Sequence, residues 1–130
     1  MEPMPDPVYL RQRLRESLRV AMNARDPIAA AAFRSAMSAV DNAEAVDGAQ
    51  APRPAHGIVG DVRLGVGAGE VARRDLSTLD VLEVFRVEIR DRIAAAAEYQ
   101  SRGRAAQATR LKAEATALES FLETVLNETR

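Results

Sequence analysis

The sequence predicts an all-α fold in which two antiparallel helical hairpins form a four-helix bundle and are joined by a long Gly/Pro-rich loop. Apolar residues recur every three or four positions in four segments, which is the period of an amphipathic helix. Residues typical of helix caps and helix ends bound these segments, and six of the seven glycines fall between the second and the third. A chain of 130 residues fits one such domain, because this length usually supports a single hydrophobic core.

The first two helices are predicted over residues 7–25 and 27–45. Asp6 and Asp26 can each accept an amide hydrogen bond as a cap, and a proline at the first helical position has no donor to lose. Because a residue before proline avoids helical geometry, Asp26 marks a short connection, and the two helices should fold back on each other. The apolar stripes expected to meet are Leu10, Leu14, Leu18, Ala21 and Met22 in the first helix and Ile28, Ala32, Phe33, Ala36, Met37 and Val40 in the second.

Residues 46–77 are expected to form a flexible loop, since glycine and proline accumulate there and the helical period stops. A short strand pair over 58–66 is the less favoured alternative, because two isolated strands are marginally stable in water. The glycines at 65, 67 and 69 lack the spacing and the following Lys-Ser/Thr pair of a phosphate-binding loop.

The third and fourth helices are predicted over residues 78–102 and 104–128. Ser77 or Thr78 can cap the third helix, Asp80 suits its positive first turn, and Gly103 can adopt the left-handed conformation that ends it. The expected stripes are Leu82, Phe85, Ile89, Ile93, Ala96 and Tyr99, followed by Leu111, Ala115, Leu118, Leu122 and Val125.

Composition excludes several classes of function. The chain has no cysteine and one histidine, His56, so neither a catalytic site, a metal site nor a cofactor is predicted. A net charge of -1 argues against a broad basic surface. The longest apolar runs are far shorter than a membrane span, and the first residues lack a secretory pattern, so we expect a soluble cytoplasmic protein without membrane contact.

Arginine supplies nearly all the positive charge, and its planar fork suits phosphate or carboxylate groups. Interleaved acidic residues favour a solvated helix face as the ordinary explanation of these clusters. Glu114 lies between Leu111 and Ala115, where a structural ion pair with an arginine is expected rather than catalysis. The candidate anion contacts are Arg11, Arg13, Arg15, Arg19 and Arg25 on the first helix, and Arg86, Arg90, Arg92, Arg102 and Arg104 on the third helix and its exit.

Several short elements, in a shared order and spacing, resemble the GatB/YqeY domain family. They cover nearly the whole chain outside residues 46–77. The chain departs from the family pattern at Asn23, Pro27 and Glu123, and the smaller C-terminal subdomain of YqeY proteins is expected to be absent. The elements that carry the resemblance are Ala21-Met22-Asn-Ala-Arg25-Asp26, Phe33-Arg34, Asn42-Ala-Glu44, Glu88-Ile89-Arg90-Asp-Arg92, Tyr99, Gly103-Arg104, Lys112-Ala113-Glu114 and Phe121-Leu122.

In that family, the related tail of the GatB subunit of glutamyl/aspartyl-tRNA amidotransferase helps to hold tRNA while glutamine-derived ammonia amidates the mischarged aminoacyl group. The resemblance therefore implies a non-catalytic module that binds tRNA or assists a glutamine-dependent tRNA amidotransferase, which is a carbon–nitrogen ligase. The alternative is a protein-interaction or assembly module, including a homo-oligomer, that pairs through an uncovered apolar strip without binding RNA. The RNA-binding candidates are Arg25, Arg34, Arg90, Arg92 and Arg104.

Overall fold

The computed structural model describes residues 4–49 and 75–128, and these residues form four α-helices and no strand. The predicted all-α class is confirmed. The part of the predicted loop over 50–74, with its strand alternative, lies outside the described residues. The helices are α1 (Pro7–Asn23), α2 (Pro27–Ala49), α4 (Thr78–Ser101) and α5 (Ala105–Glu128).

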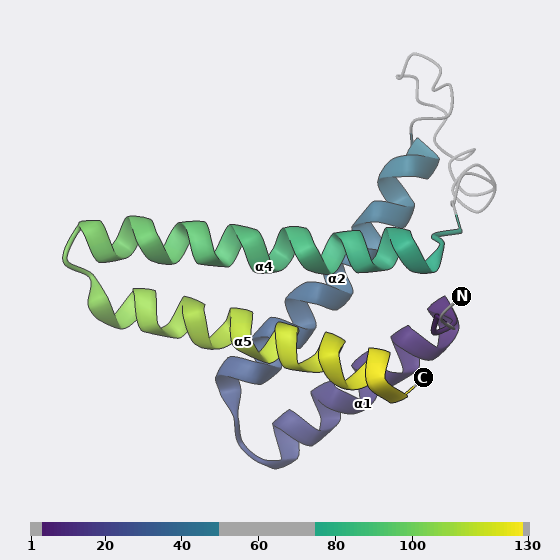
Figure 1. Cartoon of the computed structure of the whole chain (residues 1–130), viewed down its shortest axis with the longest axis horizontal. Helices are drawn as coiled ribbons and strands as arrows, with labels where there is room; N and C mark the ends of the chain where they lie inside the picture. The colour runs from purple at the N-terminus through teal and green to yellow at the C-terminus, as the bar shows by residue number, and fades with distance from the viewer. Residues whose placement is uncertain (1–3, 50–74, 129–130) are drawn as a thin grey trace, which may run out of the picture.

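The second hairpin crosses the first. Helices α4 and α5 run side by side in opposite directions, whereas α1 and α2 diverge from their turn, and α2 passes behind α4 and α5 (Figure 1). Helices α2 and α5 each contact the other three helices, so together they form the centre of the fold. The Phe33–Phe121 contact joins these two helices. Close packing is favoured by the composition of α2. Its many alanines let neighbouring helices approach closely, and Ala32 and Ala36 are completely buried.

Three of the helices begin or end with the chemistry that the sequence predicts. The Asp6 carboxylate accepts a hydrogen bond of 2.8 Å from the Val8 amide, and the Asp26 carboxylate accepts one of 3.1 Å from the Ala29 amide. Ser77 and Asp80 exchange side-chain and backbone bonds in a capping box. Gly103 follows α4 with a φ of +73°, the left-handed conformation that favours glycine.

The core is centred on three phenylalanines that come from three different helices. The Phe121 ring of α5 stacks on Phe85 of α4 with centroids 5.3 Å apart, and it meets Phe33 of α2 edge-on at 6.0 Å. Leu10 and Leu14 complete this core from α1. Because one ring touches both hairpins, the core holds the hairpins together.

Some predicted bounds and core positions differ from the structure. Helix α1 ends at Asn23 because Arg25 takes a left-handed φ of +57°, and α2 continues to Ala49 rather than ending at residue 45. Met22 is 52% exposed because it lies on the outer side of the α1–α2 turn. Ile93 and Tyr99 are also exposed, since the second half of α4 extends past α2 and only α5 packs against it (Figure 1).

Candidate functional site

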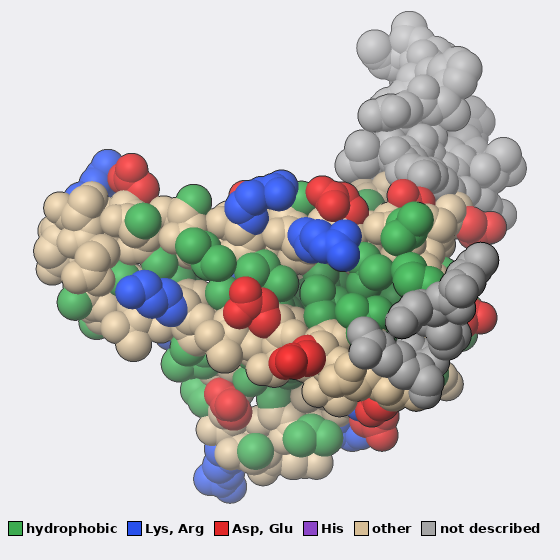
Figure 2. Space-filling model, in the orientation of Figure 1, with side chains coloured by type: hydrophobic (Ala, Val, Ile, Leu, Met, Phe, Trp, Pro, Cys, Tyr) green, Lys and Arg blue, Asp and Glu red, His purple; other side chains and the backbone are tan. Residues whose placement is uncertain are grey.

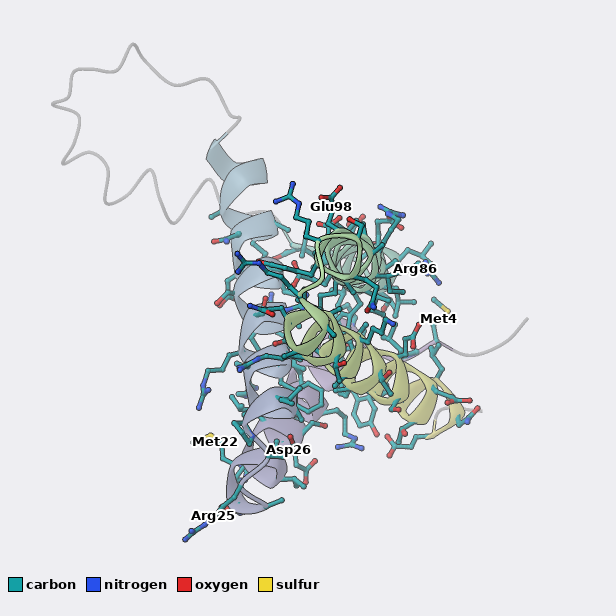
Figure 3. All side chains as sticks on the ribbon, turned by 90° about the vertical axis from the view of Figure 1, so that its left-hand side faces the viewer. Met4, Met22, Arg25, Asp26, Arg86 and Glu98 are labelled. Carbon is teal, nitrogen blue, oxygen red and sulfur yellow. The ribbon has the colours of Figure 1, made fainter. Side chains whose placement is uncertain are left out.

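A shallow hollow of about 430 Å³ lies at the turn between α1 and α2. Figure 3 shows this turn at the end of the first hairpin, with Arg25 pointing away from the body of the molecule. Apolar residues line most of the hollow, and two arginines are among its lining residues. The lining residues are Ala21, Met22, Arg25, Asp26, Pro27, Ala30 and Arg34.

The backbone of the turn determines where these side chains point. After α1 ends, the Arg25 amide donates a hydrogen bond of 3.1 Å to the Met22 carbonyl, and the Asp26 amide donates one of 2.9 Å to the Ala21 carbonyl. These bonds hold Arg25 in its left-handed conformation, which L-residues other than glycine, asparagine and aspartate rarely adopt. The tight reversal presents Arg25 outward and leaves the Asp26 carboxylate at the amino end of α2.

The residues that line the hollow carry a net positive charge. Arg25 and Arg34 are both exposed, and neither forms an ion pair within the described part of the chain. The single carboxylate present, Asp26, already accepts the Ala29 amide. Two unpaired guanidinium groups beside an apolar floor form a surface that suits an anion with a flat or apolar portion attached.

A second, smaller hollow of about 80 Å³ continues along the seam between α1 and α2. Arg11 and Arg15 of α1 face Asp41 of α2 there. Arg11 is neutralised, because it bonds Asp41 at 3.1 Å and also pairs with Glu44. Arg15 is exposed and makes no ion pair among residues 4–49 and 75–128. The helical spacing of the arginines indicated this strip, but only the structure separates the paired Arg11 from Arg15.

Arg92, a predicted RNA contact, is instead committed to the protein interior. Its Nε lies 2.9 Å from a Glu114 oxygen and its Nη1 lies 2.8 Å from a Glu88 oxygen, while Glu88 also accepts the Ser35 hydroxyl at 3.0 Å. Burial by itself lowers the pKa of Arg92, but the hydrogen bonds that Arg92 donates to Glu88 and Glu114 outweigh this effect and raise the pKa above its ordinary value. The network joins α2, α4 and α5, so it stabilises the packing of these three helices.

Arg90 and Arg104 are exposed but lie away from the hollow. Arg90 is on α4, and Arg104 follows Gly103 in the turn between α4 and α5, which is at a different end of the molecule from the α1–α2 turn (Figure 1). Of the five predicted RNA-binding arginines, the structure brings together two, Arg25 and Arg34, and leaves the other three apart.

The positions that carry the family resemblance fall into two groups. Met22 and Asp26 line the hollow, and Asn42 is exposed further along α2. The others hold the fold. Glu44 pairs with Arg11 across the first hairpin, Gly103 ends α4, and Glu114 is a buried charge that the predicted structural ion pair satisfies.

A cluster of three polar side chains, which the sequence did not indicate, joins the start of α1 to the end of α5. The Glu128 carboxylate accepts a hydrogen bond of 2.6 Å from the Tyr9 hydroxyl. It also accepts one of 3.0 Å from Nε and one of 2.9 Å from Nη2 of Arg13. The Arg13 and Tyr9 hydrogen bonds lower the pKa of Glu128, and the Glu128 bond raises the pKa of Tyr9. More than a hundred residues separate the partners, so no local pattern could reveal the contact.

Comparisons of the chain with protein families, with curated proteins and with solved structures find no match. Among the residues that the structure describes, no group of three or more histidine, cysteine or acidic side chains is arranged to hold a metal ion. None of the described helices is long and apolar enough to cross a membrane.

Proposed function

We propose that this chain is a non-catalytic helical module of the GatB/YqeY type that binds RNA, with tRNA as the candidate, through phosphate contacts at the α1–α2 turn. The main support for the proposal is that Arg25 and Arg34 lie at the same hollow. These two residues come from different helices, line one hollow, and have no carboxylate partner in the described chain.

The chemistry of the hollow favours a nucleic-acid backbone over a free inorganic anion. Each guanidinium can donate two parallel hydrogen bonds to phosphate oxygens. Ala21, Met22 and Ala30 supply apolar contact for a ribose or an unstacked base next to that phosphate. Arg15 lies further along the same seam and extends the positive strip for a second phosphate. A local strip of this kind is compatible with a net charge of -1, because only the charge near the contact attracts the ligand.

The resemblance to GatB/YqeY domains supports tRNA as the ligand. Arg25, Asp26 and Arg34 belong to the elements that carry the resemblance, and all three line the hollow. A module of this kind would hold tRNA while a glutamine-dependent amidotransferase performs the chemistry. In this role the chain itself needs no catalytic group.

Filter binding of labelled tRNA across a range of salt concentrations tests the proposal. We expect measurable affinity at low salt, and we expect the slope of log affinity against log salt to fall by about 2 in Arg25→Gln/Arg34→Gln, since each lost phosphate contact removes about one unit. The matched control is Arg102→Gln/Lys112→Gln, which removes the same charge from exposed positions in the α4–α5 turn and on α5. Equal losses in both double variants would show that only net charge matters, and no affinity in the wild type would refute the proposal.

A further inference from the structure

The α4–α5 hairpin has an apolar face opposite the side on which α2 packs. Figure 2 looks onto this face, where hydrophobic side chains fill the seam between the two helices. Leu79 is 64% exposed and Ile93 is 51% exposed, which is high for such large apolar groups on one helix. We refer to this surface as the hairpin face. Leu82, which lies between two of its members, is buried. Its apolar members, partly or largely exposed and one to three helical turns apart on each helix, are Leu79, Ile89 and Ile93 of α4 and Leu111, Leu122 and Leu126 of α5.

Charges of opposite sign border the hairpin face on its two helices. Arg86 and Arg90 are exposed one turn apart on α4, and Glu119 and Glu123 are exposed one turn apart on α5. Figure 2 shows positive groups over α4 and negative groups over α5 beside the apolar seam, along with negative groups over the right-hand part of α4 and a positive group over the left-hand part of α5, and Figure 3 labels Arg86 on this side. Within the described residues, none of these four side chains makes an ion pair.

Contacts inside the hairpin define which residues lie at the same level along it. Phe85 stacks on Phe121, and Arg92 bonds Glu114 across the same antiparallel pair. Counting back from these contacts, Arg86 is level with the turn of α5 that carries Glu119 and Glu123. Arg86 is therefore at the height of the negative pair, although the seam separates them, and Arg90 is level with residue 116, about one turn of α5 before Glu119.

We propose that the hairpin face binds a second copy of this chain in a two-fold symmetric dimer whose axis runs parallel to the hairpin. This rotation keeps every residue at its level and places α4 of one copy on α5 of the other. Arg86 then meets the partner subunit's Glu119 and Glu123, and the same contact recurs on the other side of the axis. An axis across the hairpin would instead place α4 on α4 and bring like charges together.

The hairpin face is smaller than the interface of a stable dimer, so the dimer it forms should be a weak one. From Leu79 to Ile93 the apolar residues span about 21 Å of α4, and two packed helices are roughly 20 Å wide, so the face offers about 400 Å². Stable interfaces bury about 800 Å² on each partner. The apolar seam supplies the driving force for association, and the charges select the orientation.

Light scattering and analytical ultracentrifugation of the full chain test the proposal with charge-reversal variants. We expect a dimer in the wild type. The variant Arg86→Glu/Arg90→Glu carries negative charge on both helices of the face, and Glu119→Arg/Glu123→Arg carries positive charge on both. Each variant should raise the dimer dissociation constant by about 100-fold, because like charges then meet across the interface. All four positions are exposed, so both variants should keep the helical circular dichroism of the wild type.

Two further samples make the orientation testable. A mixture of the two reversal variants should form a heterodimer, and the chain that carries all four substitutions should recover the homodimer, because each restores opposite charges across the interface. A monomeric wild type at high concentration would refute the proposal. A dimer that the reversals leave unchanged, or that the mixture fails to restore, would also refute it. Binding of tRNA is measured separately through Arg25 and Arg34, so either proposal can fail alone.

Discussion

Arg25 and Gly103 show how one backbone conformation is used in two ways. Both residues follow a helix with a positive φ, of +57° and +73° respectively. Gly103 adopts this conformation without strain, whereas Arg25 bears the steric conflict of a side chain there. Strain that is retained at an exposed residue with a free guanidinium is typical of a functional position.

Exchanging the residue types at these positions should have opposite effects on stability. Arg25→Gly relieves the strain and should raise the free energy of unfolding by about 0.5–1 kcal/mol, while weakening tRNA binding. Gly103→Ala should lower it by about 1 kcal/mol through the backbone alone, since no heavy atom lies within 4 Å of an added Cβ. Urea unfolding of both variants measures the difference, and a destabilised Arg25→Gly would contradict the strain argument.

The stability of the fold should also depend on Glu114, because this charged residue is buried. Glu114→Gln removes a carboxylate that Arg92 contacts at 2.9 Å in a largely buried site, and it should destabilise the chain by about 2–3 kcal/mol. The control Glu83→Gln changes an exposed residue of α4 and should alter stability by less than about 0.5 kcal/mol. Equal effects in chemical denaturation would mean that Arg92 does not depend on Glu114.

At the scale of helices, the caps were predictable and the contacts between distant elements were not. Asp6, Asp26 and Ser77 signal helix starts through local hydrogen bonds, so neighbouring residues in the sequence suffice to find them. Ile93 continues the apolar period of α4 but is exposed, because the period cannot reveal that α2 crosses only part of that helix. For the same reason Arg25 and Arg34 were identified only as separate candidates, and their common hollow required the fold.

The contact between α1 and α5 predicts a pH dependence of stability. The Arg13 and Tyr9 hydrogen bonds hold the pKa of Glu128 below its ordinary value of 4.5 in the folded chain. The stabilisation is therefore fully present above the unfolded pKa and is lost as pH falls through the lower folded pKa. Wild type should be more stable than Glu128→Gln at pH 7, and the gap should close in acid. A gap in urea unfolding that stays constant down to acid pH would contradict the assignment.

At the scale of the whole molecule, Phe121 connects the two hairpins. Its ring is buried and touches Phe33 of one hairpin and Phe85 of the other. Phe121→Ala should destabilise the chain by about 3–5 kcal/mol, whereas Phe121→Leu, which keeps much of the volume, should cost less than about 1.5 kcal/mol. Thermal unfolding followed by circular dichroism should remain a single transition in both variants. Separate transitions would show that the hairpins fold independently.

The apolar stripes predicted the helical class, but the crossing of the hairpins determines which surfaces remain for function. It leaves the α1–α2 turn at one end and the hairpin face on the opposite side from α2 (Figure 1). The two proposed interfaces, one for RNA and one for a second copy, therefore lie on different parts of the chain.

The most direct test of the RNA proposal is a two-dimensional ¹H–¹⁵N NMR titration of the labelled chain with tRNA at low salt. We predict that the largest shift changes and line broadening fall on the amides around Arg25 and Arg34, with little effect around Gly103 in the turn between α4 and α5. Changes centred on that second turn, or no changes at any concentration of tRNA, would contradict the account.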